Sequence, residues 1–169
     1  MKSIALGLVM AMGVGMGATA QVAIPNKPVM QTGNPGIVMS GSQDYSKLPE
    51  SARKFIERHF KGQKVTKCTQ RFAKQRYEVE LANGLDIDFD LNGKVREIEA
   101  PDNTVLSTAV VKELIHGKAY NRLVKDGIAD QVEGIEFDKH GKAVEVEVNI
   151  PNPDVYIFDI DGNFIAIED

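Results

Sequence analysis

One stretch of the sequence carries oxygen ligands at the spacing of a calcium-binding loop. Its members are Asp88, Asp90, Asn92, Gly93 and Glu99. In an EF-hand loop, such acids offer hard oxygens to Ca²⁺, the glycine makes the sharp turn, and the last glutamate chelates with both oxygens. An EF-hand loop joins two helices, whereas here apolar and polar residues alternate through both flanks, as in strands. We therefore favour a β-hairpin turn and assign no metal or cofactor, with calcium binding through Asp88, Asp90, Asn92 and Glu99 as the alternative.

A second candidate for chemistry is a set of acidic residues that alternate with apolar ones. They are Glu78, Glu80, Asp86, Asp88, Glu145 and Glu147. Because alternate residues of a strand share a face, these carboxylates are expected on one side of a sheet, opposite the core. One interpretation is an ordinary solvated face. The other is a docking surface for a basic protein or a cationic peptide, since complementary charge aids steering and specificity.

The segment from Val155 to Ile160 is apolar at nearly every position. A central strand that is covered on both faces commonly has such a continuous apolar run. The alternative is an apolar anchor on an open sheet face, with Tyr156 and Phe158 as contact residues for a partner. We include Tyr156 among the predicted partner-binding residues.

Residues that could catalyse a reaction are scattered along the chain. His59, His116 and His140 do not have metal-ligand spacing, and the sequence has neither a Gly-x-Ser-x-Gly elbow nor a phosphate-binding glycine loop. Cys68 is the single cysteine, so the chain forms no internal disulfide, and we interpret this residue as a small apolar side chain in a strand. We predict a protein that is not an enzyme, with a small hydrolase as a remaining possibility.

The N-terminal residues indicate export from the cytoplasm. Lys2 precedes a short apolar run, and Ala18-Thr19-Ala20 matches the small-x-small pattern of signal-peptide cleavage. We predict a signal peptide over residues 1–20 with cleavage near Ala20, a periplasmic or secreted protein, and no membrane span. Residues 21–47 are rich in proline and glycine and are expected to form a flexible or extended arm. The net charge of −4 argues against nucleic-acid binding.

Hydrophobic periodicity places the elements that position these residues. Helical spacing predicts a helix over residues 48–60, and period-two alternation predicts strands over 64–72, 76–81, 85–91 and 94–99. After Pro101 the pattern restarts, with helices over 106–115 and 118–125 and strands over 131–138, 142–149, 155–160 and 164–167. Three turns, at residues 90–93, 138–141 and 159–162, repeat an Asp-x-x-Gly motif that is typical of hairpins.

The two halves of this pattern can be superimposed. Residues 48–103 and residues 104–169 each contain a helical segment that is followed by four strands. This pattern predicts an internal duplication of an α-β-β-β-β unit. We expect an α+β fold in which both units share one antiparallel sheet, with the helices on one face and the other face open to water.

The first unit resembles the PepSY-like family of β-lactamase-inhibitor-like secreted bacterial proteins. The residues that carry this resemblance are Leu48-Pro49, Phe55-Ile56, His59-Phe60, Gly62, Tyr77–Leu81, Asn83-Gly84 and Phe89–Lys94. The match is looser over residues 106–168. The resemblance implies an extracytoplasmic protein of tandem helix-plus-sheet repeats. In the inhibitor protein that lends the family its name, the open face of the sheet binds the partner. The resemblance transfers no catalytic residue. We predict a binding or inhibitor-like module that docks a protein or peptide on the open face.

Overall fold

The computed structural model describes residues 45–150 and 154–168. The predicted signal peptide and most of the predicted arm lie outside these residues. Tyr45–Lys47, the last three residues of that arm, form the short 3₁₀ helix η1. Tyr45 is buried in the core, so ordered structure begins before Leu48, earlier than the sequence predicted.

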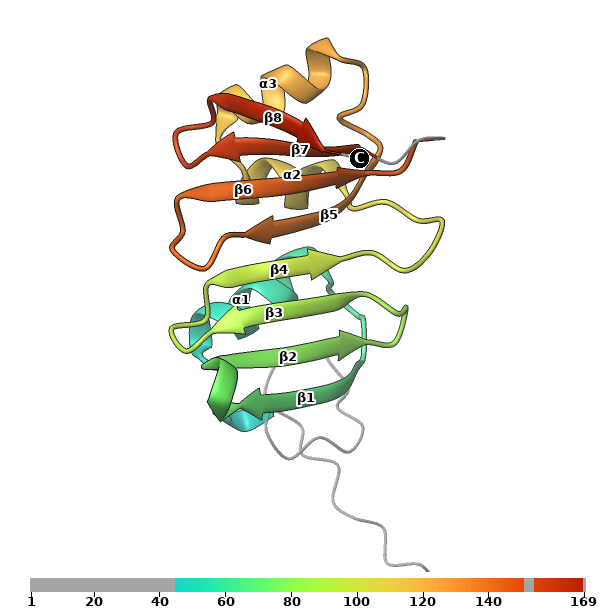
Figure 1. Ribbon diagram of the computed structural model, residues 1–169. Coiled ribbons are helices and arrows are strands. Elements are labelled where there is room, and N and C mark those ends of the chain that lie inside the picture. Colours follow the sequence, from blue (N-terminus) through green and yellow to red (C-terminus); the bar gives the residue numbers. More distant parts are fainter. Residues whose placement is uncertain (1–44, 151–153, 169) are drawn as a thin grey trace, which may run out of the picture.

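Within residues 45–150 and 154–168, eight strands form a single antiparallel sheet, with the strands in their sequence order (Figure 1). The elements are α1 (Glu50–His59), β1 (Val65–Arg71), η2 (Phe72–Lys74), β2 (Arg76–Leu81), β3 (Asp86–Asp90), β4 (Val95–Glu99), α2 (Thr108–Leu114), α3 (Gly117–Lys125), β5 (Val132–Phe137), β6 (Ala143–Val148), β7 (Asp154–Asp159) and β8 (Phe164–Glu168). This architecture confirms the predicted α+β class and the predicted helices and strands.

The helices pack against one face of the sheet, and the core lies between the two layers (Figure 1). Ala52, Phe55 and Ile56 form the buried stripe of α1, at the three- and four-residue spacing of a helical face. The strands contribute inward side chains such as Val79, Ile87, Ile98, Ile135, Val146 and Phe158. Fully burying one such side chain stabilises the fold by about 1.5 to 3 kcal/mol.

The three Asp-x-x-Gly segments are hairpin turns, as predicted. The Asp90 carboxylate accepts hydrogen bonds from the backbone N–H groups of Asn92 (2.8 Å) and Lys94 (2.9 Å). The carboxylates of Asp138 and Asp159 accept equivalent bonds in the other two turns. Such Asx turns satisfy the backbone donors that the reversal leaves outside the ladder. The glycine of each turn has a positive φ, which an L side chain rarely adopts.

Four strands contain a one-residue bulge. The extra residues are Thr66 in β1, Arg96 in β4, Glu133 in β5 and Ile165 in β8. Each bulge places two inward residues three positions apart, as with Val95 and Ile98 in β4. A bulge therefore breaks the strict alternation of faces that a sequence pattern assumes.

The two halves of the sheet meet where β4 pairs with β5. The pairing comprises Glu97 with Glu136, Ile98 with Ile135, and Glu99 with Gly134. Beyond it, the Arg96 guanidinium donates hydrogen bonds to the backbone carbonyls of Phe137 (2.9 Å) and Asp138.

On the helix side of this junction, Arg58 and His59 of α1 contact the Glu113 carboxylate of α2. The distance from His59 Nε2 to Glu113 Oε2 is 2.7 Å. Burial raises the pKa of Glu113, but the hydrogen bonds from His59 and Arg58 and the charges of these two residues together outweigh burial and lower it. The halves are thus joined on both sides of the sheet.

Candidate functional site

Among the described residues, nine carboxylates on the open face of the sheet form two rows that run across the strands, which we call the acidic rows. The first row contains Glu78, Asp88, Glu97, Glu136 and Glu145, each opposite the next on the neighbouring strand. The second row contains Glu80, Asp86, Glu99 and Glu147, with Gly134 between the last two. Like charges that face each other across strands destabilise a sheet, so these rows oppose folding.

Most of the predicted partner-binding residues lie in the acidic rows. The structure brings together Glu78, Glu80, Asp86, Asp88, Glu145 and Glu147, from both halves of the chain. The sequence analysis missed Glu97, Glu99 and Glu136, which occupy the middle of the rows. Each of these glutamates is next to an isoleucine that points into the core, and this neighbour could have placed the glutamate on the open face. The bulges in β4 and β5 interrupt the alternation of apolar and polar residues and so concealed this signal.

Tyr156 does not belong to this face, and its predicted place on the open face is wrong. Its side chain is 7% exposed and lies on the helix-covered side with Phe158, opposite the buried Val146. Val155 and Ile157 alternate with it on the open side and are half-buried. The run is therefore apolar on both faces, but only Tyr156 and Phe158 point into the core, because a strand turns alternate residues to opposite faces.

Burial and mutual repulsion raise the pKa values of several carboxyls in the rows. The pKa of Asp88 rises to about 6, mainly through burial and, among neighbouring acids, through Glu97 and Glu78, while Arg76 lowers it. Burial is also the first cause of the raised pKa of Asp86, Glu136 and Glu147, followed by neighbouring carboxylates. The folded chain thus holds acids where ionisation is disfavoured, an arrangement that often marks a functional surface.

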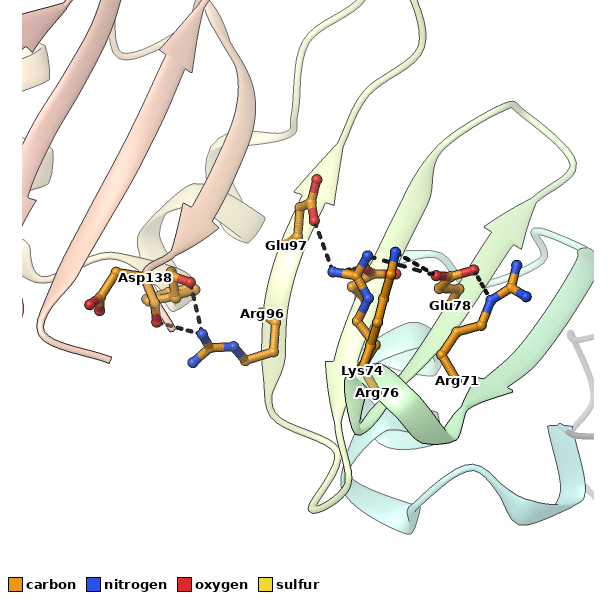
Figure 2. A network of polar contacts seen from close by, with 9 residues as sticks. Arg71, Lys74, Arg76, Glu78, Arg96, Glu97 and Asp138 are labelled. Carbon is orange, nitrogen blue, oxygen red and sulfur yellow. Dashed lines mark hydrogen bonds and ion pairs between the residues drawn. The ribbon is translucent and has the colours of Figure 1, made fainter. Parts of the chain in front are cut away.

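Arg76 is the cation at the centre of the first row. Its guanidinium lies 2.7 Å from Asp88, 3.6 Å from Glu97 and 3.7 Å from Glu78 (Figure 2). Its Nε atom is buried without a hydrogen-bond partner, so the guanidinium is held by charge more than by optimal donor geometry. Arg76 therefore offsets part of the electrostatic repulsion between the carboxylates of three neighbouring strands.

Glu78 at the end of the row is more fully compensated. Arg71 Nε donates a 2.7 Å hydrogen bond to it, and Lys74 lies 3.6 Å away (Figure 2). Burial raises the pKa of Glu78, but the Arg71 hydrogen bond and the charges of Arg71, Lys74 and Arg76 outweigh burial and lower it. The least compensated part of the face thus lies further along the rows, in β5 and β6.

Shallow hollows lie along the rows. One, of about 210 Å³, spans β2 to β4 between residues that include Glu80, Asp86 and Glu99, and another, of about 120 Å³, spans β4 to β6. Gly134 contributes to the second hollow, where an added Cβ would lie 2.8 Å from Glu147 Oε2. The absence of a side chain at this position leaves room for the crowded glutamate.

The EF-hand spacing does not produce an EF-hand site. Asp88 belongs to β3 and Glu99 to β4, Asp90 bonds the turn backbone, and the flanks are strands. Within residues 45–150 and 154–168, no three His, Cys, Asp or Glu side chains are grouped so that they could hold a metal ion. The histidines lie apart, with His59 on Glu113 and His116 capping α3.

Comparisons with known proteins agree with this fold. The family model described as putative beta-lactamase-inhibitor-like, PepSY-like matches residues 40–97. A putative calcium-regulated periplasmic protein from Bacteroides thetaiotaomicron is 30% identical, with a TM-score of 0.58, over 73% of this chain and 92% of that one. No curated protein gives a significant match.

Two solved structures from Bacteroides vulgatus are also similar. A putative periplasmic protein of unknown function is 26% identical, with a TM-score of 0.58, over 75% of this chain and 96% of that one. A second putative periplasmic protein is 29% identical, with a TM-score of 0.56, over 73% of this chain and 92% of that one. In the part of this chain that the structure describes, no helix has the length and apolar character to cross a membrane.

Proposed function

This chain belongs to the putative beta-lactamase-inhibitor-like, PepSY-like family, and from that premise we propose that it is an extracytoplasmic, non-enzymatic binding module. The observation that carries the proposal is the pair of acidic rows, in which nine carboxylates share a face with one central arginine, Arg76. Export through a signal peptide cleaved near Ala20 is supported by the periplasmic character of the similar proteins.

The partner that fits this face is a basic segment of a protein or peptide. Cationic side chains would lie against Glu136 and Glu145, and against Glu97, whose one ion-pair partner Arg76 is 3.6 Å away and is shared with Asp88 and Glu78. A positive group placed there relieves the repulsion between neighbouring carboxylates as well as making its own contacts, so binding gains from both.

The duplication of the α-β-β-β-β unit is part of the same proposal. It is supported by the bulges, which occur in the first strand (β1, β5) and the fourth strand (β4, β8) of each unit. It is also supported by the last turn of each unit, because Gly93 lies against the start of α1 and Gly162 lies against the start of α3. A duplicated sheet doubles the length of the open face that a partner can contact.

The docking proposal predicts binding of a cationic peptide that depends on the middle of the acidic rows. We expect a fluorescent decalysine peptide to bind the chain from Gln21 at 20 mM NaCl and to bind about tenfold more weakly at 200 mM, because salt screens exposed charges. The double variant Glu97→Gln/Glu136→Gln should weaken binding by a further factor of about ten. Fluorescence anisotropy measures both effects.

A matched control separates the face from net charge. Asp102→Asn/Asp130→Asn removes two exposed charges outside the acidic rows and should change the affinity by less than about twofold. Equal weakening by the two double variants would mean that the peptide senses only the overall charge, and the docking face would be rejected.

Calcium binding is a second candidate, favoured by the similarity to the putative calcium-regulated periplasmic protein. Here an ion would have to draw facing carboxylates such as Asp88 and Glu97 together, because they are not already grouped as a metal site, and it would not occupy an EF-hand loop. Calcium at a hundred times its dissociation constant should stabilise the chain by about 2.7 kcal/mol, or roughly 5 to 10 °C in Tm. Asp88→Asn should abolish that rise, and Asp161→Asn, in a turn, should retain it. Equal Tm values in calcium and in chelator reject this candidate.

A further inference from the structure

A hollow of about 750 Å³ lies on the open face between η2 and the β5–β6 turn, on the side of the first acidic row that is away from the second row. We call it the cationic hollow. Three acids line it, Asp90, Glu97 and Glu136. The other charged residues of its lining are Lys74, Arg76, Arg96 and Lys139. The open face therefore changes from purely acidic along the second row to mixed charge with a cationic excess at this end of the strands.

Two of these cations are not neutralised by the acidic rows. Lys74 and Arg76 form ion pairs with carboxylates of the first row. Among the described residues, no ion pair joins Arg96 or Lys139 to a carboxylate. The hollow thus combines two cations that belong to the row with two whose charge is available to an anionic ligand.

Backbone contacts hold Arg96 in position beside the hollow. Arg96 is the extra residue of the β4 bulge, and a bulge commonly changes the direction of a side chain next to a functional site. Its Nη2 atom donates hydrogen bonds to the carbonyls of Phe137 (2.9 Å) and Asp138, and Figure 2 shows the side chain extended toward them. Among the described residues, Nε and Nη1 have no hydrogen-bond partner. A guanidinium that is fixed by neutral carbonyls keeps its charge and donors for a carboxylate.

The two acidic rows have the spacing of an extended peptide. In β2 the first-row and second-row residues, Glu78 and Glu80, are two positions apart, and the same holds in β3 and β4. Alternate residues of an extended chain are separated by the same rise, about 6.8 Å. One further step of two positions along β2, from Glu78, reaches Arg76, which lines the cationic hollow. A peptide that lies along the strands therefore meets two acidic levels and then a cationic one.

We propose that the partner of the acidic rows is the C-terminal end of an extended basic peptide, whose free carboxylate binds Arg96 and Lys139 in the cationic hollow. The inference rests on the docking of a basic segment set out under the proposed function. It adds which part of the partner is recognised and in which direction the partner lies. Basic side chains at alternate positions contact the second row and then the first row, and the peptide ends at the level of Arg76.

Charge favours a carboxylate over a doubly charged phosphate as the anion in the hollow. Because Asp90, Glu97 and Glu136 also line it, a dianion would approach three acids as well as the cations, and unfavourable pairs of like charge weaken binding. A single negative charge at the end of a cationic segment matches the order of charges along the strands. The C-terminus of a peptide supplies that charge wherever the preceding residues are basic.

The test compares two fluorescent peptides that differ only at the C-terminus. Each contains five Lys-Ala repeats and an N-terminal fluorophore, and one ends in a carboxylate whereas the other ends in a carboxamide. We expect the chain from Gln21 to bind the carboxylate form about threefold more tightly at 20 mM NaCl, as measured by fluorescence anisotropy. General attraction to an acidic face gives the opposite order, because the carboxamide form has one more net positive charge.

Variants locate the bound carboxylate. Lys139→Gln, in an exposed turn, should remove the preference for the carboxylate form. Arg96→Gln should do the same, and circular dichroism checks its fold because Arg96 also joins the two halves. Lys142→Gln is the matched control and should retain the threefold preference. Lys142 is exposed near the same turn, but its alternation with the buried Val144 places it on the helix side of the sheet.

Three results overturn the proposal. Equal affinities for the two peptides, or tighter binding of the carboxamide form by the wild-type chain, would exclude a C-terminal carboxylate in the hollow while docking on the acidic rows stands. A preference for the carboxylate form that persists in both Lys139→Gln and Arg96→Gln would place the carboxylate elsewhere. Absence of binding by both peptides would reject docking on the acidic rows, and this inference with it.

Discussion

Replacing Arg76 with methionine is expected to lower the free energy of unfolding by about 2 to 3 kcal/mol at pH 7.5 and by less than about 1 kcal/mol at pH 5. The side chain of Asp88 is only 13% exposed, and Glu78 and Glu97 lie opposite it on the neighbouring strands. Without the guanidinium, an ionised Asp88 has no cation at 2.7 Å and two facing acids. Methionine keeps the apolar part of the arginine side chain, so the decrease in the free energy of unfolding measures the effect of removing the charge.

The pH dependence follows from the raised pKa of Asp88. Its folded value of about 6 lies above the ordinary value of 3.8, so between these pH values the folded chain binds more protons than the unfolded chain. The contribution of Asp88 to stability is therefore fully present below about pH 4 and is lost as the pH rises through about 6. At pH 5 most of Asp88 is already neutral, so Arg76 has less charge to offset.

Chemical denaturation at pH 5 and pH 7.5 measures these differences. Asp88→Asn should flatten the profile between these pH values, and Asp88→Asn combined with Arg76→Met should recover most of the stability lost in Arg76→Met at pH 7.5. Asp90→Asn, in the adjoining turn, is the control that should not rescue. Equal losses at both pH values in Arg76→Met would show that the arginine stabilises the sheet by packing and not by charge.

Gly93→Ala is expected to destabilise the chain by about 3 kcal/mol, or roughly 6 to 12 °C in Tm. Gly93 has a φ of +79°, a conformation that costs an L residue about 1 kcal/mol or more. An added Cβ would also lie 2.8 Å from Pro49 Cβ and 2.9 Å from the backbone N of Ala52, at the start of α1. Either the turn or the helix must move, and the β3–β4 hairpin carries Asp88 and Glu97.

Gly141→Ala is the matched control for this turn. Gly141 has the same role in the β5–β6 turn with a φ of +65°, but an added Cβ there meets no atom within 4 Å. We therefore expect a loss of only about 1 kcal/mol, the conformational cost alone. Thermal unfolding of both variants separates the conformational cost of the positive φ from the cost of the steric contact with α1. If Gly93→Ala loses no more stability than Gly141→Ala, the contact between this turn and α1 carries no significant energy.

Both predictions concern how the acidic rows are held. Arg76 offsets the negative charge of the first row on the open face. On the other side of the sheet, Gly93 allows the β3–β4 turn to pack closely against the start of α1. The face thus combines a rigid support with charges that reduce stability, a combination expected where a surface is maintained for binding. A partner that supplied positive charge would increase the stability of the sheet as it bound.

The elements of this fold were predictable because their signals are local. Alternation in β2, β3 and β6, helical spacing in α1 and α3, and the repeated Asp-x-x-Gly turns depend on residues close together in the chain. The face of Glu97 was harder to predict, because the bulge at Arg96 separates Val95 from Ile98 by three positions and leaves no regular alternation in β4. The prediction for Tyr156 was wrong for a related reason. Apolar residues occupy both alternating sets of positions in Val155–Ile160, so the local pattern does not indicate which side chains point into the core.

The sequence by itself determined the α+β class, the hairpin chemistry and an acidic character on one side of each half, because side-chain alternation and turn geometry are properties of short segments. Only the tertiary structure decided that the halves join through β4 and β5, that Glu97 and Glu136 complete one continuous row, and that Arg76 lies at its centre. Those features depend on register between strands far apart in the chain, and a shift of one residue would turn each side chain to the opposite face.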